Sequence, residues 1–131
     1  MITFQPEHFG LAATDVEGLK HWYVRVLGAR VVLQLGSSPP AYLLEFPGGF
    51  WVEIYSAESS SGTLGNRVAG WRHLALRVGN IEEARFHLEA AGVSFPEPVK
   101  PAGGAGRILF FSDPEGNLLH LVERPPGWKT G

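Results

Sequence analysis

The 131-residue sequence predicts an α+β fold made of two consecutive copies of a β-α-β-β-β module. Two stretches, residues 7–28 and 71–92, each have the pattern of a strand followed by an amphipathic helix that ends at a glycine. Three further strand-like runs follow each stretch. A spacing of 65 residues separates the members of two matching pairs, His8 and His73, and Asp15 and Asn80. We therefore interpret the chain as an internal duplication.

The first module begins with a predicted strand at residues 2–13, which leads into a helix. Thr14 or Asp15 can cap that helix at its start, and Gly28 is a natural stop. Apolar residues recur at helical spacing at Val16, Leu19, Tyr23, Val26 and Leu27. Three strands are then predicted at residues 30–35, 42–46 and 50–55. A Pro-Gly-Gly sequence between the last two predicts a hairpin.

The segment ESSSGTLGNRVAG, residues 58–70, is rich in glycine and serine and is predicted to be a flexible linker. After it the order repeats, with a strand at residues 71–78 and a helix at residues 81–91 capped by Asn80. Three strands are predicted at residues 93–95, 107–111 and 118–123, and the sequence SDPEGN is a strong turn signal between the last two. We expect a single domain with module 1 at 1–57, the linker at 58–70, module 2 at 71–124 and a tail at 125–131.

Composition restricts the chemistry of any site. The chain has no cysteine, so disulfides and thiolate chemistry are excluded, and histidine and carboxylate side chains are the ligands left for a transition metal. The absence of cysteine also suits a reducing cytoplasm. The formal net charge is −2 with scattered basic residues, which gives no footprint for nucleic acid or an anionic membrane. No signal peptide or membrane-spanning run is present. We expect a soluble cytoplasmic protein whose partner is a small molecule or a second copy of the chain.

Strand alternation indicates which polar side chains share a face. In the first strand of each module, His8 and His73 lie opposite the apolar residues that suit packing against a helix. Both histidines are therefore predicted to point to the other, concave side of their sheet. In the last strand of each module, Glu53 and His120 occupy similar positions, 67 residues apart.

Each module thus offers one polar residue from its first strand and one from its last, namely His8, Glu53, His73 and His120. Buried imidazole and carboxylate groups are unfavourable unless they are paired or bound, and a divalent metal would compensate all four. The alternative interpretation is that a lone histidine in a strand is more often a hydrogen-bonded structural residue than a ligand. His21 and His87 lie in the helices and are expected to be surface or packing residues.

Four further residues are candidates for binding a substrate: Trp51, Tyr55, Trp71 and Arg77. The three aromatic residues share a predicted face with Glu53 or His73, so they can form an apolar substrate wall, although they can equally fill a core. Arg77 can hold a substrate carboxylate, and pairing with a neighbouring acid is the alternative.

Several stretches resemble the vicinal oxygen chelate superfamily, which includes glyoxalase I, methylmalonyl-CoA epimerase, extradiol dioxygenases, and fosfomycin and bleomycin resistance proteins. They are HFGLAATD, HWYVRVLGARVV, WVEIY, WRHLALRV and FFSDPEGNLLHLVE. The DPEGN hairpin before the last strand is the most specific. The resemblance implies a glyoxalase-like fold, in which paired βαβββ modules form a half-barrel around one divalent metal. The metal's ligands come from the first and last strands, at His8, Glu53, His73 and His120.

One position departs from the family pattern, because His120 stands where glyoxalase I and the epimerase usually carry a second carboxylate. Three imidazoles and one carboxylate favour Fe, Ni, Co, Zn or Mn over magnesium. His8, His73 and Glu53 could also form a two-histidine, one-carboxylate face like that of non-haem iron oxygenases.

The resemblance implies a metal-dependent lyase or isomerase of the glyoxalase type, which acts through a chelated enediolate on a small substrate with adjacent oxygens. Glu53 is the first candidate for the catalytic base and His120 the second. An extradiol-type Fe(II) dioxygenase is one alternative, and a metal-free drug-binding protein like the bleomycin resistance proteins is another. The family also implies a homodimer, in which modules pair within one chain or across a swapped dimer.

Overall fold

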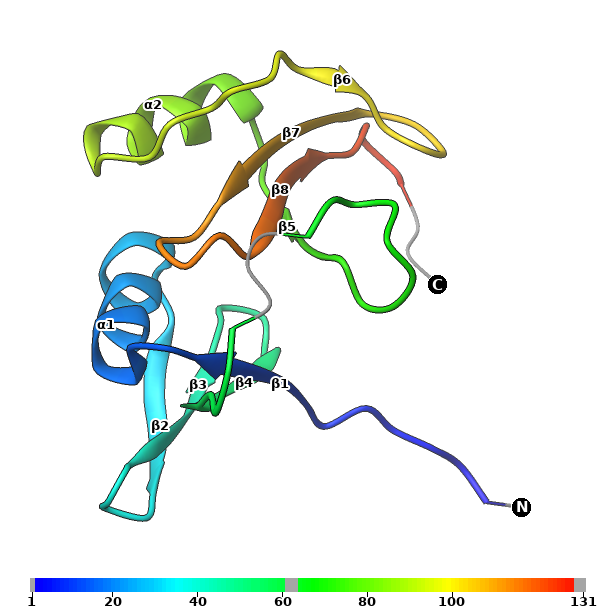
Figure 1. Cartoon of the computed structure of the whole chain (residues 1–131). Coiled ribbons are helices and arrows are strands. Elements are labelled where there is room, and N and C mark those ends of the chain that lie inside the picture. The colour runs from blue at the N-terminus through cyan, green and yellow to red at the C-terminus, as the bar shows by residue number, and fades with distance from the viewer. Residues whose placement is uncertain (1, 61–63, 129–131) are drawn as a thin grey trace. The chain divides into compact units, whose positions relative to one another are not determined.

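The structure is a computed structural model of the chain, and it describes residues 2–60 and 64–128. The chain divides into two compact units, residues 1–61 and 62–131, which we call the first and the second module (Figure 1). The linker residues 61–63 and the tail residues 129–131 of the predicted organisation lie outside the described residues. The described linker residues, 58–60 and 64–70, belong to no helix or strand.

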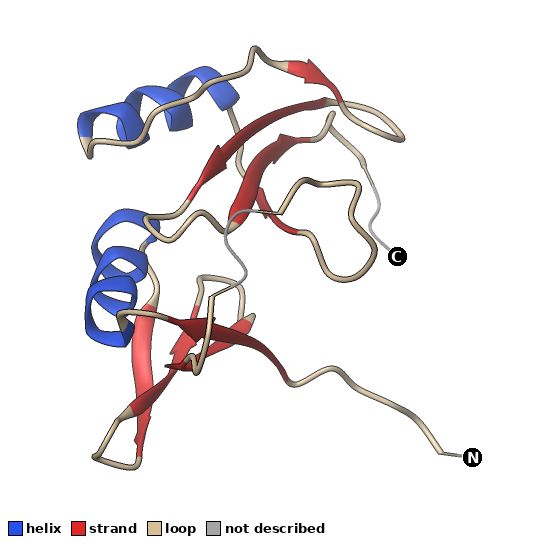
Figure 2. Ribbon diagram, viewed as in Figure 1, coloured by secondary structure: helices blue, strands red, loops and turns tan. Residues whose placement is uncertain are grey.

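The two modules have the same order of elements. The first contains β1 (His8–Ala13), α1 (Val16–Leu27), β2 (Arg30–Leu35), β3 (Ala41–Glu45) and β4 (Trp51–Ser56). The second contains β5 (His73–Arg77), α2 (Ile81–Ala90), β6 (Lys100–Pro101), β7 (Arg107–Ser112) and β8 (Leu118–Glu123). The predicted pair of β-α-β-β-β modules is therefore confirmed, and in each module the helix lies along its sheet (Figure 2). Neither described helix is long and apolar enough to cross a membrane.

Each module forms a four-stranded sheet in which the first and the last strand are neighbours. The strand orders are β1-β4-β3-β2 and β5-β8-β7-β6. The β1–β4 and β5–β8 pairs are parallel, and the other neighbours are antiparallel. The register places Gly10 opposite Glu53 and Ala75 opposite His120. Two parallel neighbouring strands need a long crossover connection, and in each module the helix is the first part of that connection.

The core of the first module lies between α1 and its sheet. The Asp15 side chain caps α1 by accepting a hydrogen bond from the Gly18 amide, and Gly28 ends the helix with a left-handed φ of 76°. Four of the five predicted apolar helix residues are buried, whereas Leu27 is only partly buried. They pack with the buried face of the sheet, at Ala13, Tyr42, Leu44, Val52 and Ile54.

The second module repeats this plan, and polar side chains also connect its helix to its sheet. Asn80 caps α2 by accepting from the Glu83 amide, and the buried sheet residues are Leu109, Phe111, Leu119 and Leu121. Glu123 on β8 accepts a hydrogen bond from the Ile81 amide (2.9 Å) and pairs with Arg107 on β7. These interactions, first of all the Ile81 hydrogen bond, lower the pKa of the Glu123 carboxyl. The charged carboxylate therefore ties the start of α2 to the sheet.

One predicted strand is wrong. Residues 93–95 form no strand, and β6 lies instead at Lys100–Pro101, where Lys100 pairs with Ile108. The Val93 amide donates back to the Leu88 carbonyl at the end of α2, and the Phe95 ring packs 5.5 Å from that of Phe111. Prolines at positions 96 and 98 each lack a donor for a strand ladder. The apolar residues of this segment therefore cover the core and do not extend the sheet.

Two strand boundaries also differ from the prediction. β1 begins at His8 and not near residue 2, and Phe4 before it is 90% exposed. β5 begins at His73 and not at Trp71. In both modules the predicted ligand histidine is thus the first residue of its strand. The residues before it lie outside the strand, so strand alternation does not determine the direction of their side chains.

The hairpin that leads into β8 is held by one buried carboxylate. Asp113 is 4% exposed, and its Oδ1 accepts hydrogen bonds from the Glu115 amide (2.9 Å) and the Asn117 amide (3.0 Å). The Asn117 side chain donates to Asp113 Oδ2 at 2.8 Å.

Asp113→Ala should lower the free energy of unfolding by about 2–3 kcal/mol, because it removes bonds to a charged, buried acceptor. Urea unfolding followed by circular dichroism measures the change, and Ser112→Ala at the exposed neighbouring position is the control. Equal stability of both variants would contradict this role for Asp113.

The Glu123 carboxylate gives a second expectation. Because its pKa is lowered on folding, it stabilises the fold above the pKa of an unfolded glutamate, and this contribution is lost as the pH falls through the folded pKa. Glu123→Gln should therefore be less stable than wild type at pH 7, and the two should converge at low pH. Thermal unfolding of both proteins between pH 7 and pH 3 tests this, and a stability difference independent of pH would contradict it.

Candidate functional site

His8 and Glu53, the two predicted ligands of the first module, lie together. The parallel β1–β4 pairing places Gly10 opposite Glu53, and the distance between His8 Nε2 and Glu53 Oε1 is 3.7 Å. Val52 and Ile54 are buried on the other face of β4, so Glu53 points away from α1. The glutamate side chain is 26% exposed, which leaves its carboxylate open to a ligand.

The second module also brings its two predicted ligands together. The rings of His73 on β5 and His120 on β8 have centroids 4.7 Å apart. Phe110 on β7 is opposite His120 in register, and its ring lies 4.9 Å from that of His120 and 5.9 Å from that of His73. The two imidazoles therefore share an aromatic neighbour, and His120 is only 7% exposed.

Burial controls the charge of His120. Removal of the ring from water lowers the pKa of His120 below the usual value of 6.5, and electrostatic interactions with His73 and Arg124 lower it further. A hydrogen bond with the backbone of Leu121 acts in the opposite direction. The net lowering keeps His120 neutral at pH 7, which is the form that binds a metal.

The three histidines share one hydrogen-bonding pattern. The Nδ1 atom of each ring faces an oxygen acceptor: Glu7 Oε1 at 2.9 Å for His8, Asn66 Oδ1 at 2.8 Å for His73, and the Leu121 carbonyl at 3.1 Å for His120. An oxygen acceptor requires a proton on Nδ1, so in the neutral ring the lone pair lies on Nε2. This is the arrangement that metal-binding histidines adopt in proteins.

The predicted ligands are therefore assembled in pairs, one pair within each module. Among the described residues, no group of three or more His, Asp or Glu side chains is close enough to hold a metal ion. A single metal held by His8, Glu53, His73 and His120 draws on both modules and stays a prediction. What the residues themselves offer is one carboxylate and three Nε2 lone pairs, a donor set that suits a divalent transition metal.

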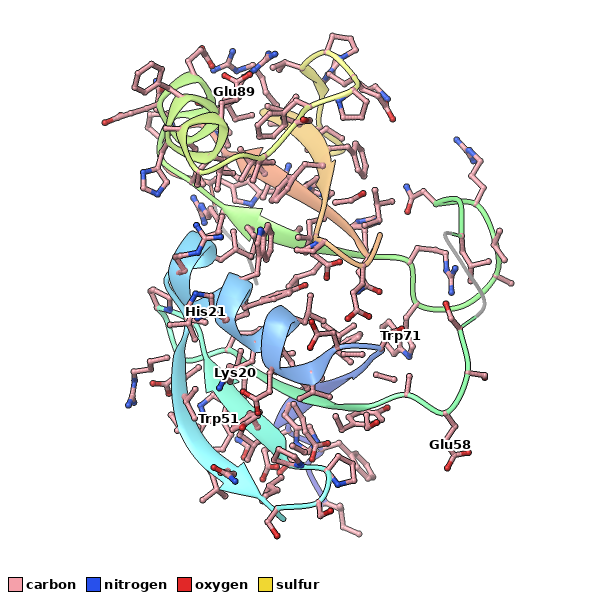
Figure 3. All side chains as sticks on the ribbon, turned by 60° about the vertical axis from the view of Figure 1, so that its left-hand side comes forward. Lys20, His21, Trp51, Glu58, Trp71 and Glu89 are labelled. Atoms are coloured by element: carbon pink, nitrogen blue, oxygen red, sulfur yellow. The ribbon has the colours of Figure 1, made fainter. Side chains whose placement is uncertain are left out.

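Two of the predicted wall residues flank Glu53. Trp51 donates from Nε1 to Glu45 Oε2 at 2.9 Å, and Arg30 holds the other oxygen of Glu45 at 2.6 Å. The Tyr55 ring lies against Gly10, where a Cβ atom would be 3.3 Å from it. Trp51 and Tyr55 are thus fixed on the Glu53 face of the first sheet, and Trp51 is labelled in Figure 3.

The structure gives less support to Trp71 and Arg77 as substrate-binding residues. Trp71 is 81% exposed and lies before the start of β5, so strand alternation does not assign it to the His73 face (Figure 3). Arg77 is the exposed last residue of β5. Their roles in substrate binding stay predictions. His21 and His87 are exposed on α1 and α2, as expected for surface residues.

Sequence reasoning missed the three side chains that contact the histidines. Glu7 is adjacent to His8, and alternation would have placed it on the opposite face, but it precedes β1 and so escapes that rule. Asn66 lies in the segment interpreted as a flexible linker. Phe110 could have been found, because a hairpin at SDPEGN pairs it with His120.

The shared aromatic neighbour leads to a prediction. Phe110→Ala should open the buried His120 ring to water, so that the pKa of His120 rises toward 6.5. NMR titration of the metal-free protein measures the pKa. Phe86→Ala on α2, where the ring is 77% exposed, is the matched control and should leave it unchanged. An unaltered His120 titration in Phe110→Ala would contradict the assigned effect of burial.

The sequence is similar to a known family over nearly its whole length. Residues 5–121 match the family described as the Glyoxalase/Bleomycin resistance protein/Dioxygenase superfamily. The uncharacterized protein YwkD of Bacillus subtilis is 30% identical over 122 residues, which cover 89% of this chain and 94% of YwkD. The uncharacterized protein YaeR of Escherichia coli is 29% identical over 124 residues, which cover 92% of this chain and 96% of YaeR.

Solved structures have the same fold. The glyoxalase family protein from Enterococcus faecalis is similar with a TM-score of 0.77 and 26% identity, over 91% of this chain and 97% of that one. The fosfomycin resistance protein FosX from Listeria monocytogenes has a TM-score of 0.72 and 21% identity, over 96% of this chain and 94% of FosX. At that identity the likeness to FosX shows the fold alone. The predicted glyoxalase-like fold class is confirmed.

Proposed function

Since the chain belongs to the Glyoxalase/Bleomycin resistance protein/Dioxygenase superfamily, we propose that it is a metal-dependent lyase or isomerase of the glyoxalase type. Its substrate is a small molecule with two adjacent oxygen atoms. The observation that carries the proposal is the common state of the three histidines, each with Nδ1 on an oxygen acceptor and Nε2 available as a ligand.

The residues that would hold the metal are His8, Glu53, His73 and His120. The donor set fits a divalent Fe, Ni, Co, Zn or Mn ion better than magnesium, because imidazole nitrogen outnumbers carboxylate oxygen. When bound, such an ion supplies Lewis acidity, which polarises a carbonyl and stabilises negative charge on adjacent substrate oxygens. A single-residue mutant of FosX from Listeria monocytogenes was crystallised with Mn(II) and 1S,2S-dihydroxypropylphosphonic acid, a ligand with adjacent hydroxyl groups. The likeness to FosX supports the fold, and the proposed substrate class rests on the family to which the chain belongs.

The proton chemistry is assigned to Glu53. It is the only carboxylate in the candidate set, its side chain is accessible, and His8 Nε2 lies 3.7 Å from its Oε1. In the proposed reaction a Glu53 carboxylate oxygen accepts the proton next to the substrate carbonyl and returns it. Trp51 and Tyr55 orient the substrate from the same face and exclude water from the reacting carbon. His120 is the second candidate for the base.

The homodimer, the cytoplasmic location and substrate binding by Trp71 and Arg77 belong to the same proposal. A second copy of the chain would allow modules to pair within one protomer or between two, as the family resemblance implies. Arg77 would hold an anionic group of the substrate.

An extradiol-type Fe(II) dioxygenase is the second candidate function. The observation that favours it is the accessible His8–Glu53 pair, which together with His73 provides two imidazoles and one carboxylate. Parallel assays on methylglyoxal adducts and on catechols, with and without oxygen, separate the two functions. Oxygen consumption belongs only to the dioxygenase.

Metal content tests the ligand set directly. Protein purified without chelators should contain about one divalent metal ion per chain by elemental analysis. His120→Ala and His73→Ala should each lower metal affinity by roughly tenfold or more, because each removes an Nε2 donor. His21→Ala on the exposed part of α1 should retain full occupancy. No stoichiometric metal in the wild type would leave only the metal-free binding protein. Normal turnover and full occupancy in His120→Ala would remove that residue from the site.

The base is tested by an isosteric change. Glu53→Gln should reduce kcat by about 10²- to 10⁴-fold on the substrate identified by those assays, because an amide cannot accept the proton. The exposed residue Glu58 provides the matched control (Figure 3), and Glu58→Gln should leave kcat unchanged. Unchanged turnover in Glu53→Gln would move the base to another residue.

A further inference from the structure

The three histidines differ in what holds their rings. The acceptor for His120 is the backbone carbonyl of its own strand neighbour Leu121, and the acceptor for His8 is the adjacent residue Glu7. His73 is held by Asn66, seven residues earlier in the chain and outside every helix and strand. One of the ligand candidates therefore depends on a side chain of residues 64–70, the segment of the second module that precedes β5.

From this contact we propose that Asn66 is a positioning residue, which fixes His73 with its Nε2 atom free to bind the metal. The proposal rests on the proposed function, and it makes residues 64–70 part of the site instead of a spacer. The Asn66 Oδ1 atom lies 2.8 Å from His73 Nδ1, so the amide oxygen accepts the Nδ1 proton and the lone pair is left on Nε2. Without this acceptor the neutral ring could carry its proton on either nitrogen.

The surroundings of His73 explain why an added acceptor matters. His73 is the first residue of β5, and its other close neighbours are the rings of His120 at 4.7 Å and Phe110 at 5.9 Å. Aromatic neighbours limit where the imidazole can lie, but neither contact determines which nitrogen holds the proton. The Asn66 hydrogen bond supplies that selection, and it also holds the segment that contains Asn66 against the start of β5.

The contact acts in both directions. If Asn66 stabilises the ligand-competent form of His73, then a metal bound to His73 must stabilise the Asn66 contact by the same free energy. Metal binding should therefore order the described part of the connecting segment, although no residue of that segment is itself a ligand. The position of residues 64–70 and the affinity for metal are therefore coupled through the Asn66–His73 hydrogen bond.

The first test needs no metal. Long-range nitrogen–proton NMR spectra of the metal-free, full-length protein should show His73 with its proton on Nδ1. In Asn66→Ala the His73 signals should change to a mixture of tautomers, whereas those of His8 and His120 stay as in the wild type. Asn66→Asp retains an acceptor oxygen and should restore the wild-type form. An unchanged His73 tautomer in Asn66→Ala would overturn the proposal.

The second test measures affinity for Co(II) by competition with a fluorescent chelator. Asn66→Ala should bind Co(II) about 10- to 100-fold more weakly than the wild type, as expected for loss of a group that orients a ligand, and Asn66→Asp should recover most of the affinity. Leu64→Ala, an exposed change two residues away, is the control for altering the segment itself. Hydrogen exchange of residues 64–70 should slow on addition of Co(II) in the wild type and not in Asn66→Ala.

The outcomes separate this proposal from the proposed function. Tight Co(II) binding by both the wild type and Asn66→Ala would overturn the role of Asn66 and leave the metal enzyme intact. No Co(II) binding by the wild type would overturn the metal enzyme, and the metal-free spectra would still decide whether Asn66 fixes the His73 ring. Circular dichroism of each variant checks that the fold is retained.

Discussion

The parallel pairing of the first and the last strand of each module is the contact on which the candidate site depends. His8 and Glu53 are 45 residues apart in the sequence, and His73 and His120 are 47 apart. The β1–β4 and β5–β8 ladders make these residues neighbours on one sheet face. The pairing requires a long connection between the two strands, and the helix in that connection covers the opposite face. The same feature therefore builds the core and leaves the polar face uncovered by its own helix.

The two modules use this plan differently. In the first, the side chains of Glu53 and His8 are 26% and 36% exposed, so solvent reaches both of them. In the second, β8 is buried on both faces, and burial holds the pKa of His120 below its usual value. An accessible carboxylate is suited to act as a base, and a desolvated neutral imidazole is suited to act as a ligand. The duplication has thus given rise to two chemically distinct halves.

Neighbouring oxygen atoms orient the rings of the three candidate histidines, His8, His73 and His120. Each Nδ1 atom faces an oxygen, from a side chain or from the backbone, which is how a protein prepares Nε2 to bind a metal. The Asp113 hairpin and the Glu123–Arg107 pair act at a greater distance, because they hold β8 and β7 in the register that places Phe110 beside His120.

The sequence by itself determined the duplicated β-α-β-β-β order, the helix caps and the pairing partners of the candidate ligands within each module, because periodicity, capping and alternation are local properties of the chain. It did not determine the true place of β6, where prolines and core packing of Phe95 override a short apolar run. Nor did it identify Glu7 and Asn66 as partners of the histidines. Those contacts come from residues outside the strands, whose direction only the tertiary structure decides, since no repeating backbone geometry fixes where such side chains point.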